Sequence, residues 1–129
     1  MPKQAPLKLI KLCCLYIARG NWKPVPHITR GIYILYRARS GKAKMFDALY
    51  IGVGGVSRKA TSGIRSRLRS HDKNKQEWTH YSFFEVHDNI SREEILELEG
   101  LFLWIFRHDS RVRLANVQRG SRIFKSLSS

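Results

Sequence analysis

Two stretches of the chain, residues 31–36 and 48–53, have the pattern of neighbouring strands. They read Gly-Ile-Tyr-Ile-Leu-Tyr and Ala-Leu-Tyr-Ile-Gly-Val, and both are rich in the β-branched and aromatic residues that strands favour. The turn residues Arg39-Ser-Gly-Lys42 lie between them, and Gly54-Gly55 ends the second stretch. The pattern therefore predicts two antiparallel strands joined by a long hairpin loop.

The next segments predict a helix and a third strand. Thr61-Ser62-Gly63 offers an N-cap for a helix over residues 64–71. In that helix Ile64 and Leu68 lie one turn apart on a narrow apolar edge, beside a basic flank. Residues 78–86 (WTHYSFFEV) have the composition of a strand.

A second helix is expected to begin at Ser91, because Ser91-Arg-Glu-Glu94 forms a capping box, and to run to about Arg107. Glu99 falls inside the apolar arc of this helix, where a carboxylate is costly unless a cation meets it. An arginine and a divalent metal ion are the two candidate partners. At about 100° per residue, the arc is formed by Ile95, Leu96, Leu98, Leu101, Phe102, Leu103, Ile105 and Phe106.

The region before residue 30 differs from the rest. Apolar residues recur there at helical spacing and helix breakers follow: Leu9, Leu12, Cys13 and Tyr16, then Gly20, Pro24 and Pro26. This pattern predicts a basic N-terminal appendage over residues 1–29, made of a short helix and a connector. A domain over residues 30–118 and a basic C-terminal tail over residues 119–129 complete the predicted organisation.

The charge of the chain indicates a polyanionic partner. There are 24 Lys and Arg against 10 Asp and Glu, for a net charge of +14. This excess favours nucleic acid over other partners. Six of the ten acids lie between residues 81 and 100, while basic residues dominate the segments on either side. The residues expected to contact nucleic acid are Arg58, Lys59, Arg65, Arg69, Lys73, Arg111 and Arg113.

Several classes of protein are excluded. A length of 129 residues favours one domain and leaves too few residues for a second core. No apolar run approaches the roughly 20 residues that span a bilayer. Lys8 and Lys11 interrupt the apolar segment 7–18, which argues against a signal peptide. The adjacent Cys13 and Cys14 form neither a disulfide framework nor a paired zinc motif. A cytoplasmic location without a membrane partner fits these features best.

The order of the motifs resembles one known family. Gly31-Ile32-Tyr33 and Tyr50-Ile51-Gly52 lie on the first two predicted strands; the residues that follow them in order are Arg67, His71, Glu99 and Asn116. The series resembles the GIY-YIG nuclease family, whose two naming tripeptides are both present, over roughly residues 30–118. The resemblance implies an α/β (α+β) domain with a small central antiparallel sheet, here of three strands, flanked by helices.

The resemblance also implies a function: a divalent-metal-dependent endonuclease that hydrolyses phosphodiester bonds, in DNA in preference to RNA. The cofactor would be Mg²⁺ or Mn²⁺, with Glu99 as its ligand. The family gathers two tyrosines, an arginine, a glutamate, an asparagine and, in some members, a histidine. Carried over by position, these catalytic residues are Tyr33, Tyr50, Arg67, Glu99, Asn116 and His71.

The chemistry of these side chains agrees with phosphodiester hydrolysis. Glu99 is a hard oxygen donor, and Mg²⁺ commonly takes only one or two carboxylates while keeping several waters. The fork of donors on Arg67 matches a phosphate. Tyr33 is the candidate to activate or orient the water, and Tyr50 to orient the water or the phosphate. His71 could accept or relay a proton.

Two classes of function stay open from the sequence. The first is the metal-dependent endonuclease. The second is a catalytically inactive basic protein on the same fold, in which the net charge supplies affinity for nucleic acid and the tyrosines are structural. The complete polar set favours the nuclease, because a pure binder has no need of Glu99 on an apolar face. A third, weaker hypothesis is a basic protein that acts on a membrane surface through residues 7–19. The sequence leaves open whether the substrate is DNA or RNA, which site or structure is cut, and the oligomeric state.

Overall fold

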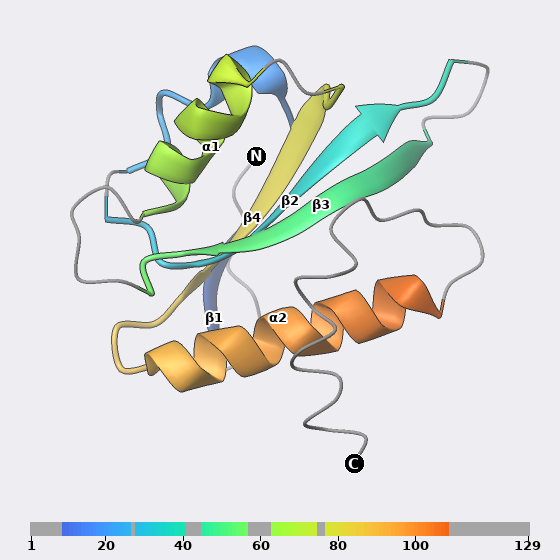
Figure 1. Cartoon of the computed structure of the whole chain (residues 1–129). Coiled ribbons are helices and arrows are strands. Elements are labelled where there is room, and N and C mark those ends of the chain that lie inside the picture. Colours follow the sequence, from blue (N-terminus) through green and yellow to red (C-terminus); the bar gives the residue numbers. More distant parts are fainter. Residues whose placement is uncertain (1–8, 27, 41–44, 57–62, 75–76, 109–129) are drawn as a thin grey trace.

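The computed structural model of the chain describes residues 9–26, 28–40, 45–56, 63–74 and 77–108. One antiparallel sheet has the strand order β1-β4-β2-β3 and contains β1 (Ile10–Ala18), β2 (Gly31–Ala38), β3 (Phe46–Gly54) and β4 (His80–Val86). The helices are the short 3-10 helix η1 (Arg19–Asn21), α1 (Ile64–Lys73) and α2 (Arg92–Arg107). Figure 1 shows α1 and α2 on opposite faces of the sheet. Within the described ranges, no helix is both long enough and apolar enough to cross a membrane.

The core has two layers, one on each face of the sheet. Because successive side chains of a strand point to opposite faces, β2 contributes to both layers. Ile32 and Ile34 pack on the side of α2, whereas Tyr33 and Leu35 pack on the side of α1. Strand β2 is therefore packed against core residues on both of its faces.

The first 29 residues contain a strand instead of the predicted helix. β1 pairs with β4 and makes the sheet four-stranded, so the expectation of three strands was also wrong. The pairing of β1 shifts register between Ile10 and Leu12 and again between Cys14 and Ile17. Each shift breaks the two-residue alternation by which a strand is identified from sequence. Residues 10–18 thus belong to the same sheet as the strands of the predicted 30–118 domain.

The other predicted elements are confirmed: the α+β class, the antiparallel pairing of β2 with β3, a strand at β4 and both helices. The capping box of α2 is formed as predicted. The Glu94 N–H donates to Ser91 Oγ at 3.1 Å, and the Ser91 N–H donates to Glu94 Oε1 at 2.9 Å. The N-cap of α1 is Gly63. Thr61, Ser62 and the predicted tail over residues 119–129 lie outside the described residues.

An ion pair ties the end of β1 to α1. Arg19 Nε donates to Asp72 Oδ1 at 2.7 Å, and Trp22 Nε1 donates to Asp72 Oδ2 at 3.0 Å. The hydrogen bond from Arg19, and then that from Trp22, holds the pKa of the Asp72 carboxyl below its usual value. The Arg19 guanidinium also lies over the ring of Trp78, with Cζ 4.4 Å from the ring centroid. The segment after β1 is therefore fixed against α1.

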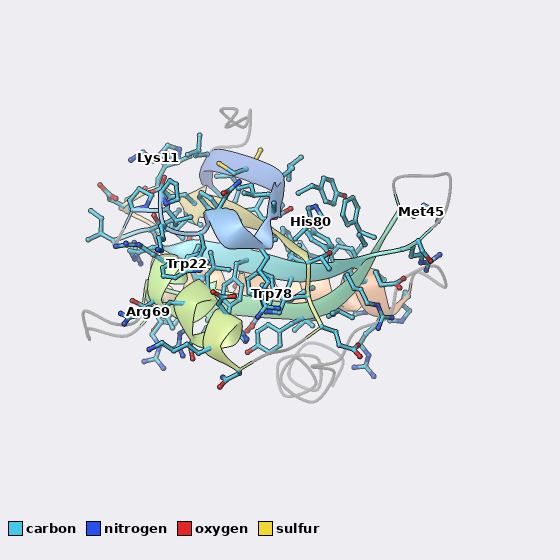
Figure 2. All side chains as sticks on the ribbon, turned by 90° about the horizontal axis from the view of Figure 1, so that it is seen from above. Lys11, Trp22, Met45, Arg69, Trp78 and His80 are labelled. Atoms are coloured by element: carbon cyan, nitrogen blue, oxygen red, sulfur yellow. The ribbon has the colours of Figure 1, made fainter. Side chains whose placement is uncertain are left out.

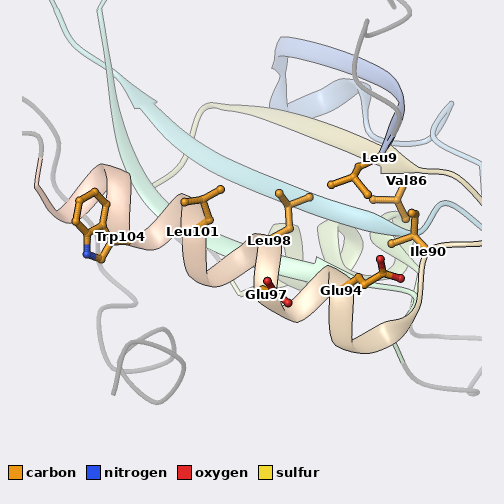
Figure 3. A pocket seen from close by; sticks show the side chains of 8 residues that line it. All are labelled: Leu9, Val86, Ile90, Glu94, Glu97, Leu98, Leu101 and Trp104. Atoms are coloured by element: carbon orange, nitrogen blue, oxygen red, sulfur yellow. The ribbon is translucent and has the colours of Figure 1, made fainter. Parts of the chain in front are cut away.

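A groove lies along α2, where residues of this helix face Leu9, Val86 at the end of β4, and Ile90. The groove has a volume of about 540 Å³ and is mostly apolar, with Glu94 and Glu97 at its edge (Figure 3). Leu101, which the sequence placed in the apolar arc, lines it and is 49% exposed. The apolar arc of α2 is thus wider than its buried face.

Candidate active site

Three of the predicted catalytic side chains lie together on the α1 side of the sheet. A hydrogen bond of 2.8 Å joins the Tyr33 hydroxyl and His71 Nε2. The ring centroids of Tyr50 and His71 are 4.6 Å apart, and the two tyrosine rings stack with their centroids 5.9 Å apart. Residues from β2, β3 and α1 thus form one polar and aromatic cluster.

The two motif glycines have steric roles in this part of the sheet. Gly52 lies opposite Tyr33 in the pairing of β2 with β3. A Cβ at position 52 would lie 2.6 Å from Cζ of Tyr33 and 2.7 Å from Cε1 of Tyr50. Gly31 has a φ of 150°, and a Cβ there would overlap the backbone oxygen of Phe84. Gly52 therefore supplies the space into which both tyrosine rings pack, and Gly31 allows β2 to approach β4.

A bulge in β3 lies next to Tyr50. Leu35 lies opposite Tyr50, but the next residue of β2, Tyr36, lies opposite Ala48. Leu49 is therefore an extra residue, and both Leu49 and Tyr50 pack against the core on the α1 side. Sequence reasoning missed this bulge because neither Gly nor Pro marks it.

Accessibility differs within the cluster. Tyr33 is only 1% exposed, whereas Tyr50 and His71 are half-buried. Tyr50 and His71 are therefore the members of the cluster that solvent reaches. The Tyr33 hydroxyl is positioned to act through its hydrogen bond with His71.

Arg67 lies one turn before His71 on α1, so the two side chains share a face of the helix. The Nε of Arg67 is buried and has no hydrogen-bond acceptor among the described residues. A buried N–H without an acceptor is destabilising. A phosphate oxygen is an acceptor that the guanidinium geometry fits well.

Glu99 is buried, as its position in the apolar arc predicted, and is 1% exposed. Glu93 and Glu97 of the same helix are exposed. Ile95, Glu99 and Leu103 form successive turns of the buried stripe, so Glu99 lies at its centre. Although α1 and α2 cover opposite faces, α2 packs against β3, which is an edge strand. The stripe of Ile95 and Leu103 that contains Glu99 packs on the α2 face of the sheet, whereas Tyr33, Tyr50 and His71 cluster on the α1 face.

The remaining predicted residues lie on α1 or outside the described residues. On α1, Arg65 is half-buried, and Arg69 and Lys73 are exposed. The predicted residues outside the described ranges are Arg58, Lys59, Arg111, Arg113 and Asn116.

The donor chemistry fits a metal ion that is shared with a substrate. In the part of the chain that the structure describes, no three His, Cys, Asp or Glu side chains are grouped to hold an ion. Mg²⁺ is usually bound through one or two carboxylates, with waters and substrate phosphates completing its shell. The buried carboxylate of Glu99 fits the role of a single protein ligand of this kind.

Comparisons with family models, curated proteins and solved structures find no match for this chain. The resemblance to the GIY-YIG family therefore rests on the motif residues themselves. The geometry adds a physical reason for both motif glycines and a contact between the tyrosines and His71.

Gly52→Ala should destabilise the protein by about 1–3 kcal/mol, because the added methyl group overpacks the Tyr33 and Tyr50 rings. Gly20→Ala is the matched control, since a Cβ at position 20 would have no atom within 4 Å, and we expect it to be neutral or slightly stabilising. Chemical denaturation of both variants measures the difference. Equal stability of the two variants would show that the rings move aside at no cost.

Proposed function

We propose that this chain is a divalent-metal-dependent endonuclease that hydrolyses phosphodiester bonds, in DNA in preference to RNA. The observation that carries the proposal is the contact of Tyr33, Tyr50 and His71, with Arg67 on the same face of α1. A proton acceptor held by a hydrogen bond, next to a phosphate-binding cation, is the combination that hydrolysis of a phosphodiester needs. The net charge of +14 brings the polyanionic substrate to the protein.

The burial of Tyr33 assigns the proton transfer to His71. In the proposed mechanism, His71 Nε2 carries a proton and donates it in the hydrogen bond to the Tyr33 hydroxyl oxygen, so Nδ1 is the unprotonated nitrogen. Nδ1 takes a proton from the attacking water as the water oxygen bonds to phosphorus. The leaving oxygen departs with the electron pair of its bond to phosphorus and takes a proton from solvent. Tyr33 is then a positioning residue that fixes the tautomer of His71.

The other side chains act on the phosphate. Arg67 donates to a non-bridging oxygen and offsets the charge that develops in the transition state. Tyr50, half-buried beside His71, orients the phosphate or the water. A bound Mg²⁺ or Mn²⁺ would supply further positive charge against the charge that develops in the transition state. Glu99 is the residue that would hold it.

The test is incubation of the pure protein with supercoiled plasmid and with structured RNA, in Mg²⁺, in Mn²⁺ and in EDTA. We expect nicking and linearisation of the plasmid with either metal and intact DNA in EDTA. In EDTA, binding should persist and weaken with salt: for about six neutralised phosphates, log K falls with log salt at a slope of roughly −5. Tight binding without cleavage of either nucleic acid would instead identify a catalytically inactive binding protein.

A further inference from the structure

A second candidate site lies on the other side of α1. Trp22 and Lys23, which follow η1, and Arg65, Ser66 and Arg69 of α1 line a pocket of about 390 Å³. Figure 2 shows Trp22 and Arg69 beside α1. None of these lining residues is acidic, and three are cationic. The lining of this pocket therefore carries positive charge, whereas the groove beside α2 is apolar and has the acidic residues Glu94 and Glu97 at its edge.

The pocket is distinct from the candidate active site. At about 100° per residue, Arg65 and Arg69 lie within about 40° of each other around the helix axis, and Arg67 lies about 160° from each of them. The helix thus directs one pair of cations into the pocket and directs Arg67 to the side of His71.

The ring of Trp22 is held in place for stacking. Its Nε1 donates to Asp72 Oδ2 at 3.0 Å, so the edge of the indole is already hydrogen-bonded. The Arg65 guanidinium lies over the ring with Cζ 5.8 Å from the centroid, near the limit of about 6 Å for a cation–π contact. Arg19 lies much closer to Trp78, at 4.4 Å. The cation–π contact of Arg65 with Trp22 is therefore the longer of the two.

We propose that this pocket binds one unpaired nucleotide of the substrate. The base stacks on Trp22, and Lys23, Arg65 and Arg69 contact its phosphate, with the Ser66 hydroxyl as a further donor. Stacking on an aromatic side chain tolerates any base because every base has a π-face, but a base within a duplex is already stacked on both sides. The pocket therefore selects single-stranded or frayed segments. The inference rests on the proposed function only in taking nucleic acid as the ligand.

The experiment measures binding in EDTA, where the proposed cleavage does not occur. The ligands are a single-stranded oligodeoxynucleotide and the duplex of the same sequence. Trp22→Ala should weaken binding of the single strand about tenfold or more and change binding of the duplex less than about twofold. The matched control is Trp104→Ala, because Trp104 is 48% exposed on α2, on the opposite face of the sheet. It should change neither affinity.

Two further measurements separate stacking from a structural effect. The single strand should quench tryptophan fluorescence in the wild type and in Trp104→Ala, but much less in Trp22→Ala. Trp22→Phe keeps a ring but loses the hydrogen bond to Asp72, so it should retain most of the affinity for the single strand. Equal losses for single strand and duplex, or a Trp22→Phe variant as weak as Trp22→Ala, would overturn the proposal. Absence of cleavage in Mg²⁺ would contradict the proposed nuclease activity. It would not affect the conclusion that the Trp22 pocket binds a single strand, because that binding is measured in EDTA.

Discussion

Glu99→Gln should lower the cleavage rate by at least about 10³-fold while binding of nucleic acid persists or tightens. Glutamine keeps the shape of the side chain but removes the charge that balances a metal ion. A metal ion contributes several kcal/mol to transition-state stabilisation, and each 1.4 kcal/mol is a factor of ten in rate. Binding should not depend on this residue, because dispersed cations would supply the affinity and the variant removes one repulsive negative charge. Cleavage assays in Mg²⁺ and binding assays in EDTA measure the two effects separately.

The stability of the same variant separates a metal ligand from a structural ion pair. Glu99 is 1% exposed, so neutralising it removes a poorly solvated charge, and the free energy of unfolding in EDTA should not fall. Breaking a buried ion pair from one side would instead cost about 3–5 kcal/mol. Glu97→Gln is the control, because Glu97 lies on the same helix but is exposed. A destabilised Glu99→Gln protein that cuts at the wild-type rate would end the assignment of Glu99 as a metal ligand.

The sequence predicts those parts of the fold in which local pattern and tertiary environment agree. The capping box of α2 and the alternation of β2 are local features, and both appear where the sequence indicates. β1 does not, because its two register shifts arise from pairing with β4, some 70 residues away in the chain. A bulge interrupts the two-residue period that identifies a strand. The helical spacing of Leu9, Leu12, Cys13 and Tyr16 was therefore misleading.

In the candidate site, too, some features can be predicted from the sequence and others depend on tertiary contacts. The motif glycines and the tyrosines are visible in the sequence, but their contacts depend on the register that places Gly52 opposite Tyr33. Helical periodicity places Glu99 in the apolar arc, but its burial also depends on which part of that arc packs on the sheet, since Leu101 of the same arc is 49% exposed. The burial of Tyr33 depends on α1 covering its face of the sheet, and it changes the expected role of this residue from activating water to positioning His71. Trp22 was missed because its role depends on the distant partners Asp72 and Arg65.

His71→Ala should lower the cleavage rate by about 10³-fold, within the range for loss of a general base. Tyr33→Phe should lower it by only about 10- to 100-fold, since the ring still packs against Gly52 and only the hydrogen bond to His71 Nε2 is lost. Because the hydroxyl acts through His71, the double variant should be no slower than His71→Ala alone. Single-turnover cleavage in Mg²⁺ gives the rates, and binding in EDTA should be unchanged throughout.

A matched control for the loss of a tyrosine hydroxyl is Tyr81→Phe. Tyr81 is also buried on the α1 side of the sheet, but its hydroxyl donates to the backbone oxygen of Asn21 at 2.8 Å. This variant should lose about 1 kcal/mol of stability and keep the wild-type cleavage rate. If Tyr33→Phe is as slow as His71→Ala, and the double variant is slower than either, the Tyr33 hydroxyl contacts the reacting water itself. That result would restore the role that the sequence predicted for Tyr33 and refute the assignment of the proton transfer to His71, because two groups that act only as a unit cannot have additive effects.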